Sequence, residues 1–428
     1  MPVYRKEMNK TKFMQMERIF YKFANLIGNT LMKKYLLLLS VGFLPFSPLH
    51  AQTNQWPDVP GAVIDHQPAS SKQYIGSPSI AILPNGDYVA SHDLFGPQSS
   101  EFVQAMSRVF RSSDQGKTWK QVSEIRGAFW SSLFVHRGAL YLLGPDRHHG
   151  TVLIRRSDDG GETWTAPTGT ENGLLLKGMF HCAPMPVIEH NGRIWRAMET
   201  AHGPILDWGK RYGAMMMSAP VDADLLKASS WTTSNSLLYD STYLSGNFTG
   251  WLEGNAVVAP DGGIVDILRV DDKTTHDEKA AIVKISADGK VATFDPQTGF
   301  IPFPGGSKKF AIRFDEKSGR YWTLSNIIPD EFCQQYPKRN PAGFRNTLAL
   351  MSSDDLVNWQ THEIILQHPD VLNHGFQYVD WLFEGDDMIV ASRTAYDDGP
   401  EQAHNNHDAN FLTFHRITDF RNKTTKHL

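Results

Sequence analysis

The chain has 428 residues, of which 41% are hydrophobic, 21% are charged and 11% are aromatic, and its formal net charge is −4. This is the composition of a globular protein without a basic surface for nucleic acid. Two cysteines exclude a disulfide scaffold and a four-cysteine zinc module. Abundant Gly, Pro and aromatic residues favour many short strands and turns.

The first segment with a recognisable pattern is a predicted export signal. Lys33 and Lys34 precede an apolar run at residues 35–46, and a small residue suitable for cleavage follows. The run is too short to span a bilayer as an anchor. We therefore expect an extension plus signal peptide at residues 1–51. Residues 52–428 are then expected to form one exported domain that is monomeric, periplasmic and without a membrane span.

The rest of the chain repeats one unit, in which an apolar strand, a Gly-containing turn and a second apolar strand follow one another. Asn-Gly and Asp-Gly between alternating strands are strong hairpin signals. The unit occurs at residues 79–91, 132–143, 184–197, 256–268, 310–324 and 379–391. Six such units predict an all-β fold, a six-bladed β-propeller of four-stranded antiparallel blades. We expect residues 52–76 to pair with the strand at 410–416 and to close the ring.

A second motif follows two of the hairpins. Residues 112–119 and 157–164 both read Ser-x-Asp-x-Gly-x-Thr-Trp, and residues 352–359 hold a degenerate copy with Leu356 in place of Gly. Asp caps a tight turn, Gly takes positive φ and Trp packs under the turn. The motif resembles the Asp box of sialidase-type propellers, in which it lies between outer strands, away from the active site.

Antiparallel neighbours place the starts of first strands and the ends of second strands on one face of the ring. Ligand sites in propellers favour the mouth of the central channel on such a face. The residues expected at this mouth are His92, Asp93, Trp130, Arg147, His181, His202, Glu253, Arg269, Lys309, Tyr378, Asp380 and Arg393. Many of these groups are titratable, which favours an enzyme over a binding module.

The pattern resembles the sialidase family over essentially the whole chain after the leader. In that family three arginines clamp a carboxylate, a Tyr activated by a Glu is the nucleophile, and an Asp is the acid/base. Glu253, Arg269 and Tyr378 match the Glu, one Arg and the Tyr. The first-blade Arg is missing, however, and Lys309 stands where another Arg is expected. Lys cannot reproduce the bidentate fork of Arg, so a different acidic sugar, a uronate, is the predicted substrate.

The predicted chemistry is elimination from a uronate-terminated oligosaccharide. Arg269, Lys309 and Arg393 would neutralise the carboxylate and acidify the neighbouring ring proton. A base would then remove that proton and leave a 4,5-unsaturated uronate.

The predicted bases are Tyr378, His181 and His202. The enzyme would be a lyase if a sugar leaves and a dehydratase if water leaves. The sequence resembles the oligosaccharide dehydratase type of ulvan-degrading marine flavobacteria. No cofactor is expected, because His404 and His407 fit no standard zinc spacing.

Two alternatives stay open. The first is an exo-acting glycosidase of sialidase type that uses Tyr378 and Glu253, with Asp93 or Asp380 as a second carboxylate. The second is a non-catalytic glycan-binding propeller, because a fold does not settle a function.

Overall fold

The computed structural model describes residues 55–272, 276–399 and 401–423. All the described strands belong to one compact unit, Trp56–Leu428. The predicted export signal at residues 1–51 lies outside the described residues, so export and the domain boundary at residue 52 stay predictions. No helix among the described residues is long and apolar enough to cross a membrane.

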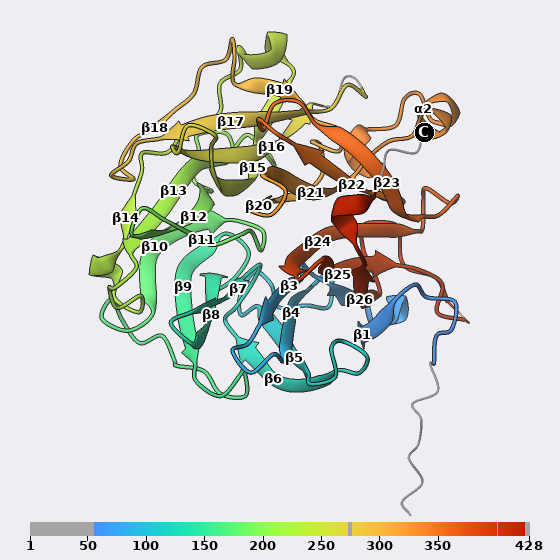
Figure 1. The fold of residues 1–428 in the computed structure, drawn as a ribbon, viewed down its shortest axis with the longest axis horizontal. Coiled ribbons are helices and arrows are strands. Elements are labelled where there is room, and N and C mark those ends of the chain that lie inside the picture. Colours follow the sequence, from blue (N-terminus) through green and yellow to red (C-terminus); the bar gives the residue numbers. More distant parts are fainter. Residues whose placement is uncertain (1–54, 273–275, 400, 424–428) are drawn as a thin grey trace, which may run out of the picture. The chain divides into compact units, whose positions relative to one another are not determined.

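The strands form five sheets that follow one another around a central axis (Figure 1). The first sheet comprises β2 (Tyr74–Ile75), β3 (Ser79–Ile82), β4 (Tyr88–Phe95), β5 (Met106–Ser112) and β6 (Lys120–Arg126). The second comprises β7 (Ser132–His136), β8 (Ala139–Pro145), β9 (Gly150–Ser157), β10 (Leu174–His181), β11 (Ile188–His190), β12 (Arg193–Thr200), β13 (Gly213–Pro220) and β14 (Thr232–Thr233). The third comprises β15 (Phe248–Val258), β16 (Ile264–Asp272), β17 (Lys279–Ile285), β18 (Ala292–Thr293) and β19 (Phe300–Pro302).

The last two sheets have four strands each. One comprises β20 (Ala311–Asp315), β21 (Arg320–Asn326), β22 (Thr347–Ser353) and β23 (Gln360–Gln367). The other comprises β24 (Gly375–Glu384), β25 (Asp387–Ala395), β26 (Phe411–Ile417) and β1 (Ala62–His66). In the part of the chain that the structure describes, the connections contain the short α-helix α2 (Asp330–Gln335) and the 3-10 turns η1 (Ala69–Ser71), η2 (Ala228–Ser230), η3 (Tyr243–Gly246), η4 (Pro341–Gly343) and η5 (Phe420–Asn422).

The all-β propeller architecture agrees with the prediction, but the count of six separate four-stranded blades is wrong. β10 pairs with β12 through Phe180–Thr200 and His181–Glu199, which joins two meanders into one eight-stranded sheet. The reason is that β11 covers only the first three residues of β12. The far end of β12 therefore takes its backbone partners from β10.

The ring closes as predicted. β1 pairs antiparallel with β26, from Ala62 opposite Phe414 to His66 opposite Phe411. The first described strand thus completes the sheet of the last hairpin and joins the two ends of the ring.

The Asp boxes form outer turns, between β5 and β6 and after β9. In the first box Asp114 Oδ1 accepts the Thr118 N–H at 2.9 Å, and Trp119 Nε1 donates to Gly116 O at 3.1 Å. In the degenerate copy Leu356 adopts φ of 69°, the left-handed conformation of the missing Gly. Its side chain is buried, and this packing offsets the local strain.

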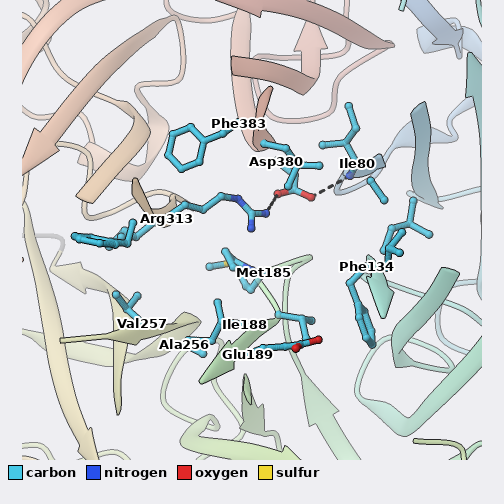
Figure 2. A pocket seen from close by; sticks show the side chains of 18 of the residues that line it. Ile80, Phe134, Met185, Ile188, Glu189, Ala256, Val257, Arg313, Asp380 and Phe383 are labelled. Atoms are coloured by element: carbon cyan, nitrogen blue, oxygen red, sulfur yellow. Dashed lines mark hydrogen bonds and ion pairs between the residues drawn. The ribbon is translucent and has the colours of Figure 1, made fainter. Parts of the chain in front are cut away.

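We call the face at which the second strands of the hairpins end the upper face, and the opposite one the lower face. A cavity of about 750 Å³ opens inside the lower part of the ring and is lined mostly by apolar side chains (Figure 2). Asp380 lies here and not at the upper mouth where it was predicted. Its carboxylate accepts from Arg313 Nη2 and from the Ile80 N–H, both at 3.0 Å (Figure 2). The reason is a register shift between Gln377 and Asp380, which turns the chain between them.

Candidate active site

A cavity of about 310 Å³ lies at the upper face. Its lining holds three arginines and one phenol, namely Arg269, Arg345, Arg393 and Tyr378. Its other polar side chains are Glu101, His148 and His407. The remaining wall is aromatic and consists of Phe95, Phe129, Trp130 and Trp208. Four predicted residues meet here: Trp130, Arg269, Tyr378 and Arg393.

Three guanidinium groups surround the phenol of Tyr378. Arg269 Nη1 lies 3.4 Å from its hydroxyl oxygen. The Cζ atoms of Arg345 and Arg393 lie 5.4 and 4.9 Å from its ring centroid, within the range of cation–π attraction. All three arginines are buried. The cavity therefore gathers three guanidinium groups around one phenol.

Irregular backbone conformations set the direction of the Glu253 and Tyr378 side chains. Glu253 has φ of 54° and Tyr378 has φ of 52°, both in the left-handed region that bulky residues avoid. Each lies at a register shift, within β15 and β24 respectively. Bulges of this kind re-aim side chains beside active sites, where local strain concentrates.

Glu253 lies behind the cavity wall and holds Arg269. Its Oε2 accepts from Arg269 Nη1 at 3.1 Å, and both side chains are buried. The same Nη1 contacts the Tyr378 hydroxyl. Glu253 thus acts on the cavity through the arginine that it orients.

His181 forms a buried pair with Glu199 outside the cavity lining. His181 Nδ1 and Glu199 Oε2 are 2.8 Å apart, and Glu199 Oε1 accepts the Gly254 N–H at 2.9 Å. Burial lowers the pKa of His181 to about 3 and raises the pKa of Glu199 to about 7. The pair supports the strand that bears Glu253. The His181 imidazole packs against Trp130 and Trp208, behind the cavity lining, and is not part of the lining itself.

Glu101 is a carboxylate of the cavity that the sequence interpretation missed. Its Oε2 accepts the Gly96 N–H at 2.8 Å and the Ser99 hydroxyl at 3.1 Å. Its Oε1 lies 3.5 Å from His148 Nδ1, whose imidazole also lines the cavity. Glu101 lies in the loop after β4. The positions of strand starts and strand ends, on which the prediction depended, say nothing about residues within that loop.

Arg345 was not predicted either. Lys309 was predicted as the third cation of the site, together with Arg269 and Arg393. Lys309 Nζ donates to Val379 O at 2.5 Å inside the ring, and burial lowers its pKa to about 8. It does not line the cavity. Arg345 stands two residues before β22, where its Nη1 donates to Gln377 Oε1 at 2.5 Å. The third strand of a blade begins on the upper face, as the first strand does. The same strand-start rule could therefore have placed Arg345 at the mouth.

The other predicted residues lie outside the lining. His92 is buried between strands, with Nε2 2.9 Å from Asp65 Oδ2. Arg147 is exposed and pairs with Asp146 at 2.9 Å. His202 is exposed in the loop after β12. These residues were expected at the mouth because of their strand-end positions. His92 instead lies within β4 and packs between strands, and Arg147 and His202 lie in loops that keep them out of the lining.

Asp93 lies just beneath the lining. Its Oδ1 accepts the Trp130 N–H at 3.1 Å, and its Oδ2 has no hydrogen-bond partner among the described residues. Burial raises its pKa to about 7. By accepting the Trp130 N–H, Asp93 helps to hold Trp130 in its left-handed conformation, with φ of 42°.

Replacing Asp93 with Asn should change how stability depends on pH. The folded-state pKa of about 7 exceeds the ordinary value of 3.8, so the folded chain keeps a proton that the unfolded chain releases between these values. Asp93 therefore makes the wild type lose stability as pH rises through this window, and the variant lacks that contribution. We expect the free energy of unfolding, variant minus wild type, to rise by about 1.4 kcal/mol per pH unit within it. Denaturant titrations of both proteins at pH values near each end of the window measure these free energies of unfolding. If the difference between variant and wild type did not change with pH, the raised pKa of Asp93 would be contradicted.

Among the described residues, no group of three or more His, Cys, Asp or Glu is placed to hold a metal ion.

Comparison with known proteins shows the fold. No protein-family model matches the chain, and no curated protein matches it. Solved structures do match. An α-L-arabinanase of Penicillium chrysogenum complexed with arabinobiose aligns at 15% identity and a TM-score of 0.51, over 85% of this chain and 98% of that one. The GH93 α-L-arabinofuranosidase of Fusarium graminearum with arabinobiose aligns at 10% identity and 0.54, over 84% and 97%.

A third similar structure is the leech intramolecular trans-sialidase complexed with 2,7-anhydro-Neu5Ac. It aligns at 11% identity and a TM-score of 0.52, over 84% of this chain and 70% of that one. At these identities the likeness concerns architecture. The likeness shows that the chain has a β-propeller fold, which the repeated hairpins and the Asp boxes predicted.

Proposed function

We propose that the protein is a glycoside hydrolase that removes a terminal sugar bearing a carboxylate. The observation that supports this most is the trio of buried guanidiniums around Tyr378. Guanidiniums bind carboxylates through parallel charge-assisted hydrogen bonds. A charged cavity of about 310 Å³ accommodates one such sugar. The neighbours of the same fold are named as arabinanase, arabinofuranosidase and trans-sialidase, and they favour a glycosidase over a lyase.

In the proposed reaction Tyr378 is the nucleophile. Its oxygen attacks the anomeric carbon, the glycosidic C–O bond breaks, and water later hydrolyses the glycosyl–tyrosine bond. Glu253 takes up the phenol proton, because its Oε2 and the Tyr378 oxygen both contact Arg269 Nη1 and therefore lie near each other. Glu101 donates a proton to the leaving oxygen, because it is the carboxylate of the lining.

Elimination, the chemistry predicted first, has weaker support in the cavity. His181 is bound to Glu199, His202 is exposed, and neither lines the cavity. Of the three predicted bases only Tyr378 faces the space where a substrate fits. Oligosaccharides of the ulvan type remain useful substrates, because their terminal uronate matches the arginine trio.

The test incubates the purified chain with oligosaccharides ending in a uronic or sialic acid and with matched chains ending in arabinofuranose. Reducing sugar and ultraviolet absorbance of an unsaturated uronate are followed together. We expect release of the acidic sugar without a rise in absorbance. A rise in absorbance would establish elimination, and release of arabinose alone would overturn the carboxylate assignment.

Replacing Glu101 with Gln should expose its role as the acid. The amide is isosteric but has no proton to give, so hydrolysis of an alkyl or sugar glycoside should slow by about 10²- to 10⁴-fold. Hydrolysis of an aryl glycoside with a good leaving group should slow far less, because that oxygen departs without protonation. Measured kcat values for the two substrates decide the matter. Equal losses on both would show that Glu101 only shapes the loop.

A further inference from the structure

Exposed apolar side chains gather beside the upper cavity. Phe102 is 64% exposed, Leu206 67% and Trp208 43%. They come from two loops of the upper face, residues 96–105 after β4 and residues 201–212 after β12. Exposed apolar clusters on globular proteins mark binding surfaces.

This cluster is continuous with the cavity. Trp208 is itself a lining residue. The ring of Phe102 stacks on His148 at 4.9 Å between centroids, and the Trp208 ring lies 5.9 Å from the same imidazole. We call Phe102, His148 and Trp208 the aromatic rim. A molecule that leaves the cavity on this side passes over it.

Hydrogen bonds order both loops of the rim. The backbone of Glu101, next to Phe102, accepts the His148 N–H at 2.8 Å. Arg211 N donates to Asp207 O at 3.1 Å, which closes a turn around Trp208. Rigid aromatic side chains on ordered loops lose little conformational entropy when they bind a partner.

We propose that the aromatic rim binds the sugar rings that follow the acidic terminal residue. The substrate is then an oligosaccharide chain cut from its acidic end, rather than a small glycoside. This inference rests on the proposed function, because it takes the cavity as the site of the terminal sugar. A pyranose ring offers an apolar C–H face to an aromatic ring and polar edges to an imidazole. The arginine trio lies in the cavity and not on the rim, so the rings bound outside are expected to be neutral.

The test measures binding without turnover, in the full chain with Tyr378→Phe. Glycans of one, two and four sugars that end in a uronic or sialic acid are compared with the same chains ending in a neutral sugar. We expect affinity for the acid-ended glycans to rise roughly tenfold from one to four sugars. Phe102→Ala should remove most of that rise and leave binding of the single acidic sugar unchanged, because Phe102 lies outside the cavity lining. Trp208→Ala should also remove most of the rise, and it should weaken binding of the single sugar as well because Trp208 lines the cavity. Phe314→Ala, at a 46% exposed phenylalanine of the lower cavity, is the matched control and should keep the rise.

The outcomes separate the rim from the proposed function. A rise with chain length that depends on Phe102 and Trp208, for acidic and neutral ends alike, supports the rim and overturns the carboxylate site. Preference for acidic ends without any effect of length supports the carboxylate site and overturns the rim. Absence of binding to every glycan overturns both.

Discussion

Replacing Tyr378 with Phe should lower kcat on an acid-ended glycoside by about a thousandfold or more. The substitution removes one oxygen, the atom proposed to form the glycosyl–enzyme bond. The ring itself stays, so its contacts with Arg345 and Arg393 persist. Steady-state kinetics on the purified variant measure the loss, and its far-ultraviolet circular dichroism and unfolding midpoint should match those of the wild type.

The control for this variant is Tyr239→Phe, a partly buried phenol that stacks on Phe248 away from the cavity. It should keep wild-type kcat. If Tyr378→Phe retained more than about a tenth of the activity, the hydroxyl would not be the nucleophile. A water molecule would then have to displace the leaving group directly, without a covalent intermediate, and the wild type would be expected to invert the anomeric centre.

The architecture could be predicted because its signals are local. All six turn glycines of the repeated hairpins adopt positive φ, for example 88° at Gly86 and 81° at Gly262. A Gly between two alternating strands reports this conformation directly. The pairing of β10 with β12 has no such signal, because it depends on how far β11 extends along its neighbour.

Sequence patterns predicted only those site residues that lie at the ends of strands. Arg269 and Arg393 were found because the second strand of a hairpin must end on the upper face. Glu101 and Trp208 sit on loops whose course the sequence does not dictate, so no periodicity pointed to them. Asp380 was misplaced because two residues along a strand normally share a face, and the positive φ of Tyr378 breaks that rule.

Replacing Arg345 should show whether the arginine trio recognises a carboxylate. Burial lowers the pKa of Arg345 to about 10, so the guanidinium remains charged at neutral pH. Arg345→Lys keeps a cation but loses the planar fork, and kcat/KM on an acid-ended glycoside should fall by about 10- to 100-fold. Arg345→Met keeps an apolar stem without charge and should fall further.

The decisive comparison uses a neutral-ended glycoside of the same aglycone. If Arg345 binds a carboxylate, both variants should lose activity on the acidic substrate and little on the neutral one. The ratio of kcat/KM on the acidic substrate to kcat/KM on the neutral substrate should therefore fall. Arg156→Lys, at an exposed arginine paired with Asp158, should change neither rate. Equal losses on both substrates would assign Arg345 to holding Gln377 and the strand beneath Tyr378, since its Nη1 already donates to that amide. The carboxylate preference would then have to rest on Arg269 and Arg393.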